Sequence, residues 1–475
     1  MGTKYDAVVV GAGPNGLAAA IRLAQESLSV LLIEANDTVG GGSRSVELTR
    51  PGFVHDICSA IHPMAAGSTF FQSLDLESFG LDWIHPEIPL AHPLEDGRAA
   101  VMYRSLDDTA ESLGQDGRAY HRLMQPLRDN WDALFDDAMR PLIHLPKRPV
   151  MMARFGMRAL QPAMTLAVRH LRTEEGRALF GGLAAHSLLS LEAPVSSAIG
   201  LMLGGAGHAV GWPMPRGGAQ SIADALLAVF LSLGGELQTG RRIERLEELP
   251  PSEITLLDLT VHQFLRIAGA WLPPRYRRQL QRFRFGPAVF KLDYALREPV
   301  PWKAEICGRA GTVHIGGTLD EIAKSENAVT NGRHAERPFI LAAEHSRFDP
   351  SRAPDGGHTL WAYCHVPHGS TVDMTDPIER QIERFAPGFH DCIIERHKMN
   401  SADLEEKNEN IVGGDINGGT ASLAQLFARP ILSWNPYRTP IEGVYLCSAS
   451  TPPGGGVHGM CGFRAAEQAL AHMRR

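Results

Sequence analysis

This 475-residue sequence lacks several features, and each absence excludes a class of function. Its six cysteines show neither CxxC nor CxxxxC spacing, which argues against a metal site or a redox-active disulfide and indicates reduced thiols. Lys and Arg number 46 against 53 Asp and Glu, and this excess of negative charge argues against nucleic acid as a partner. Glycines interrupt the longest apolar candidate, 195–212, so no run reaches the roughly 18 to 20 residues of a membrane-spanning helix.

The composition is that of an ordinary globular protein. Hydrophobic residues make up 44% of the chain and charged residues 21%, which gives no sign of a fibrous or disordered class. A chain of 475 residues exceeds what one hydrophobic core usually serves, so we expect two structural units. The apolar run Tyr5–Val10 begins too close to the first residue to follow a signal peptide, and we therefore expect a cytoplasmic protein.

The beginning of the chain has the pattern of a βαβ unit. The run Tyr5–Val10 predicts a strand, the Ala- and Leu-rich stretch to about Gln25 predicts a helix, and the run Val30–Ile33 predicts a second strand. A glycine turn, GAGPNG at 11–16, separates the first strand from the helix. Parallel strands joined in this way place the turn and the helix N-terminus at one point, where a ligand can bind.

This turn has the GxGxxG spacing of dinucleotide-binding folds. Gly11 permits the tight turn, Gly13 lets the backbone approach a diphosphate, and Gly16 lets helix and strand pack closely. The helix N-terminus offers unpaired N–H groups and a partial positive charge to that diphosphate. Glu34 lies 18 residues after Gly16, near the offset of about 20 for the carboxylate that binds the adenosine ribose. The predicted site comprises Gly11, Gly13, Pro14, Asn15, Gly16 and Glu34.

A second glycine-rich loop, VGGGSR at 39–44, favours FAD over NAD as the cofactor. It follows Glu34 closely, and its glycines allow the backbone to pass near a long ligand. Arg44 can supply a counter-charge to a phosphate. We therefore predict that Gly41, Gly42 and Arg44 contact FAD.

With these motifs the sequence resembles, over nearly its whole length, the phytoene desaturase and carotenoid isomerase branch of the amine-oxidase-like flavoproteins. The most specific part is the tail at 445–463, YLCSASTPPGGGVHGMCGF. This tail looks like the C-terminal FAD signature of the subgroup called pyridine nucleotide-disulfide oxidoreductase domain-containing protein 2. The blocks at 311–317, 361–367 and 410–416 are similar to the same subgroup.

The resemblance implies that the tail loop and the N-terminus of the last helix lie beside the flavin. A helix N-terminus there would stabilise the negative charge of a reduced flavin. Many relatives have Gly-Asp at the end of the preceding strand, whereas Ser448-Ala449-Ser450 stands here, so the usual carboxylate contact is missing. The remaining predicted FAD contacts are Ile243, Ser450, Gly455, Gly456, Val457, His458, Gly459 and Met460.

The predicted fold class is α/β, with a Rossmann-like FAD-binding domain of the amine-oxidase (GR2) type interleaved with a second α+β substrate domain. The FAD-binding domain is expected at 1–95, 205–262 and 425–475. The substrate domain is expected at 96–204, which reads as helical, and at 263–424, which contains an antiparallel sheet. A basic amphipathic stretch, Met151–Arg172, is typical either of a solvated helix packed on one face or of a helix at a membrane surface or substrate mouth.

The predicted function is FAD-dependent hydride transfer to or from an apolar, carotenoid or other isoprenoid-like substrate, as in desaturases and saturases, with oxygen or quinone as electron acceptor. Alternatives are a redox-neutral flavin-dependent isomerase, a non-catalytic binding or escort protein of the same fold, and an amine oxidase, which needs an aromatic cage. His458, beside the glycine loop, is the candidate catalytic acid or base, and the weaker candidates are His62, His314 and His365.

No second nucleotide-binding turn is readable in the sequence. The nearest candidate, Gly205-Ala206-Gly207, has no third glycine and meets Pro213 too soon for a helix. We therefore expect no dedicated NAD(P)H domain. A homodimer and a peripheral contact with a membrane are both open at this point.

Overall fold

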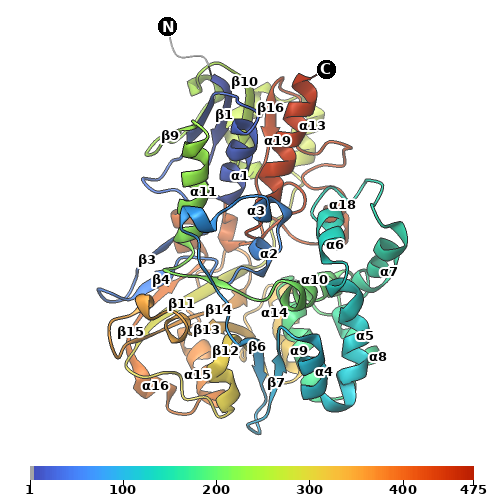
Figure 1. Ribbon diagram of the computed structural model, residues 1–475, viewed down its shortest axis with the longest axis vertical. Coiled ribbons are helices and arrows are strands. Elements are labelled where there is room, and N and C mark those ends of the chain that lie inside the picture. Colours follow the sequence, from blue (N-terminus) through green and yellow to red (C-terminus); the bar gives the residue numbers. More distant parts are fainter. Residues whose placement is uncertain (1–4, 475) are drawn as a thin grey trace.

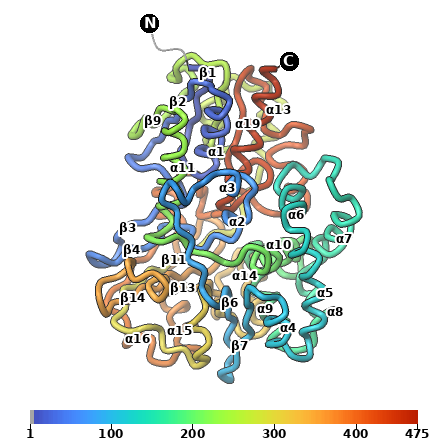
Figure 2. The backbone as a smooth tube through the Cα atoms, viewed as in Figure 1, coloured from blue at the N-terminus to red at the C-terminus, as the bar shows by residue number. Residues whose placement is uncertain are grey.

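The structure, a computed structural model, describes residues 5–474 and is organised around two large β-sheets. Figure 1 shows the first sheet at one end of the molecule, together with both ends of the chain, and the second sheet at the opposite end. The helices α4 to α10 lie beside the second sheet. The chain crosses between the two ends several times, so neither half of the molecule is one continuous segment (Figure 2).

The first sheet has five parallel strands in the order β16-β10-β1-β2-β9. β1 (Tyr5–Val10) lies at the centre, between β2 (Val30–Ile33) and β10 (Ser252–Leu257). β9 (Glu236–Gln238) and β16 (Val444–Leu446) form the two edges. Because these strands come from the beginning, the middle and the end of the chain, the prediction of an interleaved Rossmann-like domain is confirmed.

Alternate residues of β1 pack on opposite faces of this sheet. Ala7 and Val9 belong to one hydrophobic core, whereas Val8 and Val10 belong to another. The first face is covered by α1 (Pro14–Ala24), α11 (Gln220–Ser232) and α19 (Met460–Met473). The second face is covered by α12 (Val261–Ala268) and α13 (Pro274–Leu280). A strand buried on both faces explains why β1 reads as a continuous apolar run.

The second sheet has seven strands in the order β15-β11-β14-β13-β12-β6-β7. Neighbouring strands are antiparallel except β12 and β6, which run parallel. The predicted antiparallel sheet of the second domain is thus confirmed, with one parallel pair that was not expected. The strands are β6 (Ile88–Pro93), β7 (Ala99–Met102), β11 (Ala288–Leu296), β12 (Ala310–Ile315), β13 (Ile340–Ala343), β14 (His358–Val366) and β15 (Ile393–Met399).

The two faces of the second sheet have different neighbours. On β14, Leu360, Ala362 and Cys364 pack in a core with α15 (Thr375–Phe385). The alternate residues Trp361 and Tyr363 join the large core that also contains the first sheet. One face of the second sheet is therefore turned toward the first domain. Two short antiparallel pairs complete the strands: β3 (Ser45–Glu47) pairs with β4 (Val54–Asp56), and β5 (Trp83–Ile84) pairs with the distant β8 (Met214–Pro215).

The segment between β7 and β8 is helical, as the sequence predicts. Its helices are α4 (Leu106–Ser112), α5 (Gly117–Arg128), α6 (Trp131–Ala138), α7 (Pro149–Ala159), α8 (Ala163–His170), α9 (Glu174–Ala185) and α10 (Ser196–Ala209). The remaining α-helices are α2 (Pro63–Ala66), α3 (Thr69–Gln72), α14 (Leu319–Thr330), α16 (Phe389–Cys392), α17 (Ser401–Lys407) and α18 (Leu423–Phe427).

The basic stretch Met151–Arg172 is divided between α7 and α8 because Pro162 interrupts the helical pattern. Met157, Leu160 and Val168 are exposed on it. A solvated helix and a membrane or substrate-mouth helix both stay predictions for this stretch. Within residues 5–474, no helix is long and apolar enough to cross a membrane.

The positions of several elements differ from the predicted domain boundaries. β6 lies before the expected boundary at 95 but pairs in the second sheet. Residues 205–209 belong to α10 of the helical segment rather than to the first domain. α12 and α13 extend past the boundary at 262 and pack on the first sheet. Strand pairing and helix packing decide to which domain a segment belongs. The apolar pattern of a segment predicts that it is buried but not the element on which it packs.

Candidate functional site

The predicted glycine turn joins β1 to α1 and leaves almost no room for side chains. Gly13 is the N-cap residue of α1, and Pro14 is its first residue. Gly11 has a φ of +95°, and a Cβ on Gly16 would lie 1.8 Å from the carbonyl oxygen of Gly11. Gly11 and Gly16 therefore have to be glycine for strand and helix to meet. Gly13 lines the cavity, where its backbone is open to a close approach.

Glu34 stands at the end of β2 with its carboxylate fixed beside this turn. Its Oε2 accepts a hydrogen bond from the N–H of Ala12 at 2.8 Å, and its Oε1 accepts one from the N–H of Asn36 at 2.9 Å. The residue is buried and lines the same cavity. The side-chain amide of Asn36 donates a third hydrogen bond, to Oε1 at 2.9 Å. A carboxylate has about four lone-pair sites, so Oε2 can still accept a hydrogen bond from a ribose hydroxyl.

A second carboxylate, that of Asp258, reaches the turn from the end of β10. The sequence analysis did not single it out. Its Oδ2 accepts a hydrogen bond from the N–H of Gly16 at 2.9 Å and would lie 3.0 Å from a Cβ on Gly13. Burial, together with the charge of Glu34, raises the pKa of Asp258 to about 7, although the hydrogen bond from Gly16 acts in the opposite direction. Asp258 thus places a titrating acid where a diphosphate would approach.

The second glycine-rich loop lies directly against the first. A Cβ on Gly41 would lie 3.1 Å from the Cα of Gly13, so the two loops touch. The guanidinium of Arg44 donates to the carbonyl oxygen of Gly41 at 3.0 Å and to the carbonyl oxygen of Lys407. Burial lowers the pKa of Arg44. These bonds tie Arg44 to the backbone of its own loop and to the last residue of α17 (Ser401–Lys407), whereas Gly41 and Gly42 line the cavity.

The loop between β16 and α19 forms the opposite wall of the cavity. Ser450, Gly456 and Val457 line it. His458 is buried behind them, and its Nδ1 accepts a hydrogen bond from the N–H of Met460 at 3.0 Å. Burial lowers the pKa of His458 to about 4, so the ring is neutral near pH 7. In this position the imidazole satisfies an N–H at the start of α19.

One cavity of about 370 Å³ connects these loops with the second domain. Its volume lies within the range of roughly 300–1,000 Å³ that is typical of small-molecule sites. The wall from the second sheet is formed by Leu341, Trp361 and Tyr363. The rings of Trp361 and Tyr363 meet edge to face, with centroids 5.0 Å apart and an angle of 80°. The cavity therefore joins a polar glycine cradle to a largely apolar chamber.

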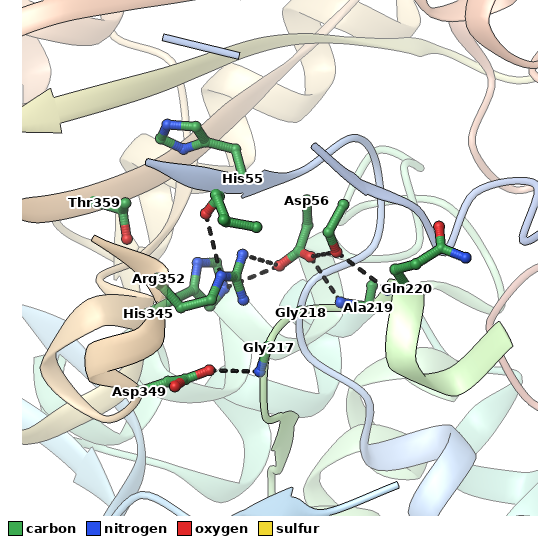
Figure 3. Close-up of polar contacts among 12 residues, drawn as sticks. His55, Asp56, Gly217, Gly218, Ala219, Gln220, His345, Asp349, Arg352 and Thr359 are labelled. Carbon is green, nitrogen blue, oxygen red and sulfur yellow. Dashed lines mark hydrogen bonds and ion pairs between the residues drawn. The ribbon is translucent and has the colours of Figure 1, made fainter. Parts of the chain in front are cut away.

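A buried ion pair holds the two domains together (Figure 3). Asp56 Oδ2 accepts a hydrogen bond from Arg352 Nη2 at 2.9 Å, and Asp56 Oδ1 accepts one from the N–H of Ala219 at 2.8 Å. Arg352 belongs to the segment between β13 and β14, whereas Ala219 precedes α11. Burial alone raises the pKa of Asp56, but Arg352, His345 and the hydrogen bonds outweigh it and hold that pKa well below its usual value.

Comparison with known proteins adds to this geometry. Residues 9–74 match the family described as NAD(P)-binding Rossmann-like domain. The chain is 26% identical to pyridine nucleotide-disulfide oxidoreductase domain-containing protein 2 of Rattus norvegicus, over 98% of this chain and 93% of that protein. It is 23% identical to a lycopene-forming phytoene desaturase of a Paracoccus species, over 96% of this chain and 95% of that protein. The chain is thus similar to a phytoene desaturase over nearly its whole length.

The chain also shares its fold with solved amine oxidase structures. Wild-type putrescine oxidase bound to putrescine has a TM-score of 0.64 at 18% identity, covering 100% of both chains. The predicted resemblance to amine-oxidase-like oxidoreductases is therefore confirmed at the level of the fold. The rat relative is an oxidoreductase domain-containing protein by name, and the fold is that of the putrescine oxidase structure.

The residues at the turn fit the adenosine diphosphate part of a dinucleotide. The cradle of Gly11, Gly13 and Gly16 would be filled by any Cβ, and Glu34 is held where a ribose would lie. Asp258 is the exception, because its carboxylate takes the N–H of Gly16 that could otherwise serve the diphosphate. Protonation of Asp258 removes the repulsion, so the site fits a dinucleotide when that acid is neutral.

The structure brings most of the sequence-predicted contacts to one cavity. The predicted residues that line it are Gly11, Gly13, Pro14, Asn15, Glu34, Gly41, Gly42, Ile243, Ser450, Gly456 and Val457. Those that are absent from its lining are Gly16, Arg44, Gly455, His458, Gly459 and Met460. Residues of the second group pack against other parts of the chain. A Cβ on Gly455, for example, would lie only 2.6 Å from the Cα of Asn417.

The three weaker histidine candidates have different surroundings. His62 lines the cavity, shares a hydrogen bond of 3.2 Å with Ser59, and has its pKa lowered to about 4 by burial. His314 and His365 are buried on the face of the second sheet that is turned toward the first domain. His186, Trp212, Trp361 and Tyr363 are cavity residues that the sequence analysis did not assign. The alternation of β14 could have marked Trp361 and Tyr363 as sharing a face, but not which face is lined by a cavity.

Other expectations concern groups outside this cavity. Gly205-Ala206-Gly207 lies inside α10 and forms no turn between a strand and a helix. All six cysteines are free thiols. Among residues 5–474, no group of three or more His, Cys, Asp or Glu is arranged to hold a metal ion.

Proposed function

We propose that this protein is an FAD-dependent oxidoreductase that transfers a hydride between the flavin and an apolar, isoprenoid-like substrate, as desaturases and saturases do. The observation that carries the proposal is the single cavity that joins the glycine cradle to the chamber under β13 and β14. A cofactor held in the cradle by its adenosine diphosphate would extend toward Ser450 and Val457. A substrate would then lie between that loop and the apolar wall of Leu341, Trp361 and Tyr363.

Each group of residues has a part in this proposal. Glu34 would bind the ribose, and the backbone of the glycine turn would bind the diphosphate. The bound flavin supplies the hydride acceptor or donor. Trp361 and Tyr363 exclude water and hold an apolar carbon skeleton in place by packing against it. The start of α19 places its N-terminal partial positive charge near the loop Gly456–Val457, where it favours a negatively charged reduced cofactor.

Three alternatives from the sequence analysis differ in what they require. An isomerase would use the same site with reduced flavin and no net oxidation of substrate. A non-catalytic binding protein would keep FAD without responding to substrates. Amine oxidation would require an aromatic cage that faces the flavin, and reduction of the flavin by amines alone would favour this alternative.

Anaerobic reduction of the purified protein tests the proposal. The oxidised flavin spectrum is followed after addition of polyenes, monoterpenes, amines or NADH, and reoxidation is then started with oxygen or a quinone. We expect bleaching by an apolar compound and rapid reoxidation by oxygen or quinone. A colourless protein that cannot be reconstituted with FAD overturns the proposal. Rapid reduction by NADH contradicts the expected lack of a nicotinamide site, and reduction by amines alone favours an amine oxidase.

Peripheral membrane contact and a homodimer are further proposals of the same kind. The exposed apolar residues of α7 and α8 are the surface on which membrane contact would act. Flotation of the protein with anionic and neutral vesicles, and its mass by light scattering, measure both properties directly.

A further inference from the structure

A pair of histidines forms part of the chamber wall that the second domain contributes. His186 is the C-cap residue of α9 and lines the cavity. His314 lies on β12 and is completely buried. Their Nε2 atoms are 3.0 Å apart, so the two rings share one hydrogen bond. Such a bond needs a proton on one nitrogen and a lone pair on the other.

The surroundings of His314 indicate which of the two Nε2 atoms carries the shared proton. Its Nδ1 is buried without a hydrogen-bond partner, because Gly182 packs against it so closely that a Cβ there would lie 2.6 Å away. An unpaired buried N–H is rarer in proteins than an unpaired buried acceptor. His314 therefore carries its proton on Nε2 and donates it to Nε2 of His186. It follows that His186 carries its own proton on Nδ1, for which the described residues provide no acceptor.

Both rings are neutral near pH 7. Burial lowers the pKa of His186 to about 3, with a smaller contribution from the nearby His365. Burial, together with His186, His92 and His365, places the pKa of His314 well below its usual value. Glu326 does not offset this, because its carboxylate is paired with His365 Nδ1 at 2.7 Å. His186 thus acts as a neutral hydrogen-bond donor and not as a cation.

A second donor lies on the same wall. Thr312 precedes His314 by two residues on β12, so both side chains are on one face of the strand. The Oγ1 of Thr312 accepts a hydrogen bond from Trp212 Nε1 at 3.0 Å, which leaves its hydroxyl proton free to donate. The ring of Trp212 also meets that of His186, with centroids 6.3 Å apart. Two neutral donors therefore stand together in a chamber that is otherwise mostly apolar.

We infer that the substrate is an apolar molecule with one carbonyl oxygen, and that His186 and Thr312 bind this oxygen by hydrogen bonds. A carbonyl oxygen has two lone pairs and no proton, which matches two donors. A carboxylate would require a cation, and the Arg and Lys residues of the lining come from other segments, namely Arg241, Arg242, Arg266 and Lys407. A hydrocarbon would leave both donors unpaired at a cost. This inference rests on the proposed function and narrows its substrate class.

Equilibrium binding of a matched pair of probes tests the inference. Carvone is the ketone counterpart of the hydrocarbon limonene, and each is titrated anaerobically into the FAD-loaded protein while the flavin absorbance is followed. We expect carvone to bind at least about tenfold more tightly, since a buried hydrogen bond contributes about 1.5 kcal/mol. His186→Phe keeps a ring in place and should weaken carvone binding about tenfold without changing limonene binding. Thr312→Val is a second, independent variant with the same expected direction.

Two further measurements separate binding chemistry from folding. The infrared carbonyl stretch of bound carvone should move to lower frequency in the unaltered protein and return toward its free value in His186→Phe. His121→Phe, which removes a surface histidine paired with Asp107 on α4, is the matched control and should change neither affinity. Equal affinities for carvone and limonene, or equal losses for both probes in His186→Phe, overturn the inference. A protein that binds no FAD rejects the proposed function instead, so the two failures are distinguishable.

Discussion

Asp258 provides the sharpest prediction, because an acid near its titration point faces the predicted diphosphate site. In the FAD-free protein its pKa is about 7. A diphosphate stays ionised between pH 6 and 8, so its binding is favoured when Asp258 is protonated and opposed when Asp258 is charged. Two charges about 4 Å apart interact by about 4 kcal/mol at an effective dielectric constant of roughly 20, which is enough to make protonation nearly obligatory for binding.

The size of the expected pH effect on FAD affinity follows from the titration of Asp258. Above pH 7 each further unit reduces the protonated fraction tenfold, so FAD affinity should fall about tenfold between pH 6 and pH 8, which corresponds to about 1.4 kcal/mol. Asp258→Asn keeps the shape of the side chain and removes the titration. In this variant the affinity should be nearly independent of pH and, at pH 8, about tenfold higher than in the unaltered protein.

The assay is equilibrium titration of the FAD-free protein with FAD, followed by flavin fluorescence at several pH values. Glu34→Gln is the matched control, since it changes a neighbouring carboxylate that is predicted to bind the ribose. It should weaken FAD binding at every pH, and the fall in affinity should begin at a lower pH, because the charge of Glu34 contributes to the raised pKa of Asp258. A flat profile in the unaltered protein, or the same slope in Asp258→Asn, would refute the reasoning.

Three further predictions concern stability and the turn. In the FAD-free protein the pKa of Asp258 is raised from 3.8 to about 7, so the contribution of Asp258 to the free energy of unfolding is fully present below pH 3.8 and is lost as the pH rises through 7. Asp258→Asn should therefore raise the free energy of unfolding at pH 8 by up to about 4 kcal/mol, measured by urea titration. Asp56→Ala leaves the buried Arg352 without its carboxylate partner and should lower the free energy of unfolding by about 3–5 kcal/mol, and full stability in calorimetry would contradict a stabilising role of this ion pair. Gly13→Ala should weaken FAD binding at least tenfold with little change in melting temperature, because the φ of Gly13 is −73° and a Cβ there points at Asp258 Oδ2; a parallel loss of both would point to folding instead.

The local sequence pattern was sufficient to predict the part of the site formed by the glycine turn and Glu34. The strand Tyr5–Val10, the turn at 11–16 and Glu34 follow one another within a single βαβ unit. Their relative positions are set by short-range geometry, because a strand, a tight turn and a helix have fixed lengths per residue. The glycine spacing and the acid at the next strand end therefore predict a site without knowledge of the rest of the fold.

The other half of the site depends on contacts between distant segments. His186, Thr312 and Trp361 come from a helix end and two strands that are far apart in the sequence. Their alternation shows which residues share a face, but the pairing order of seven strands decides which face is turned toward the cavity. The sequence analysis did not find Asp258 for the same reason, because Asp258 reaches the glycine turn only when β10 pairs with β1.

By itself, the sequence determined that a glycine turn of the dinucleotide-binding type follows the first strand, because this feature lies in a short motif with few allowed geometries. The placement of the tail beside this turn was implied by the family resemblance. Only the tertiary structure decided which side chains surround the apolar chamber, that His186 and His314 share a hydrogen bond, and that Asp258 faces the glycine turn. Burial and the proximity of other charges set these properties, and both arise when segments separated by more than a hundred residues pack together.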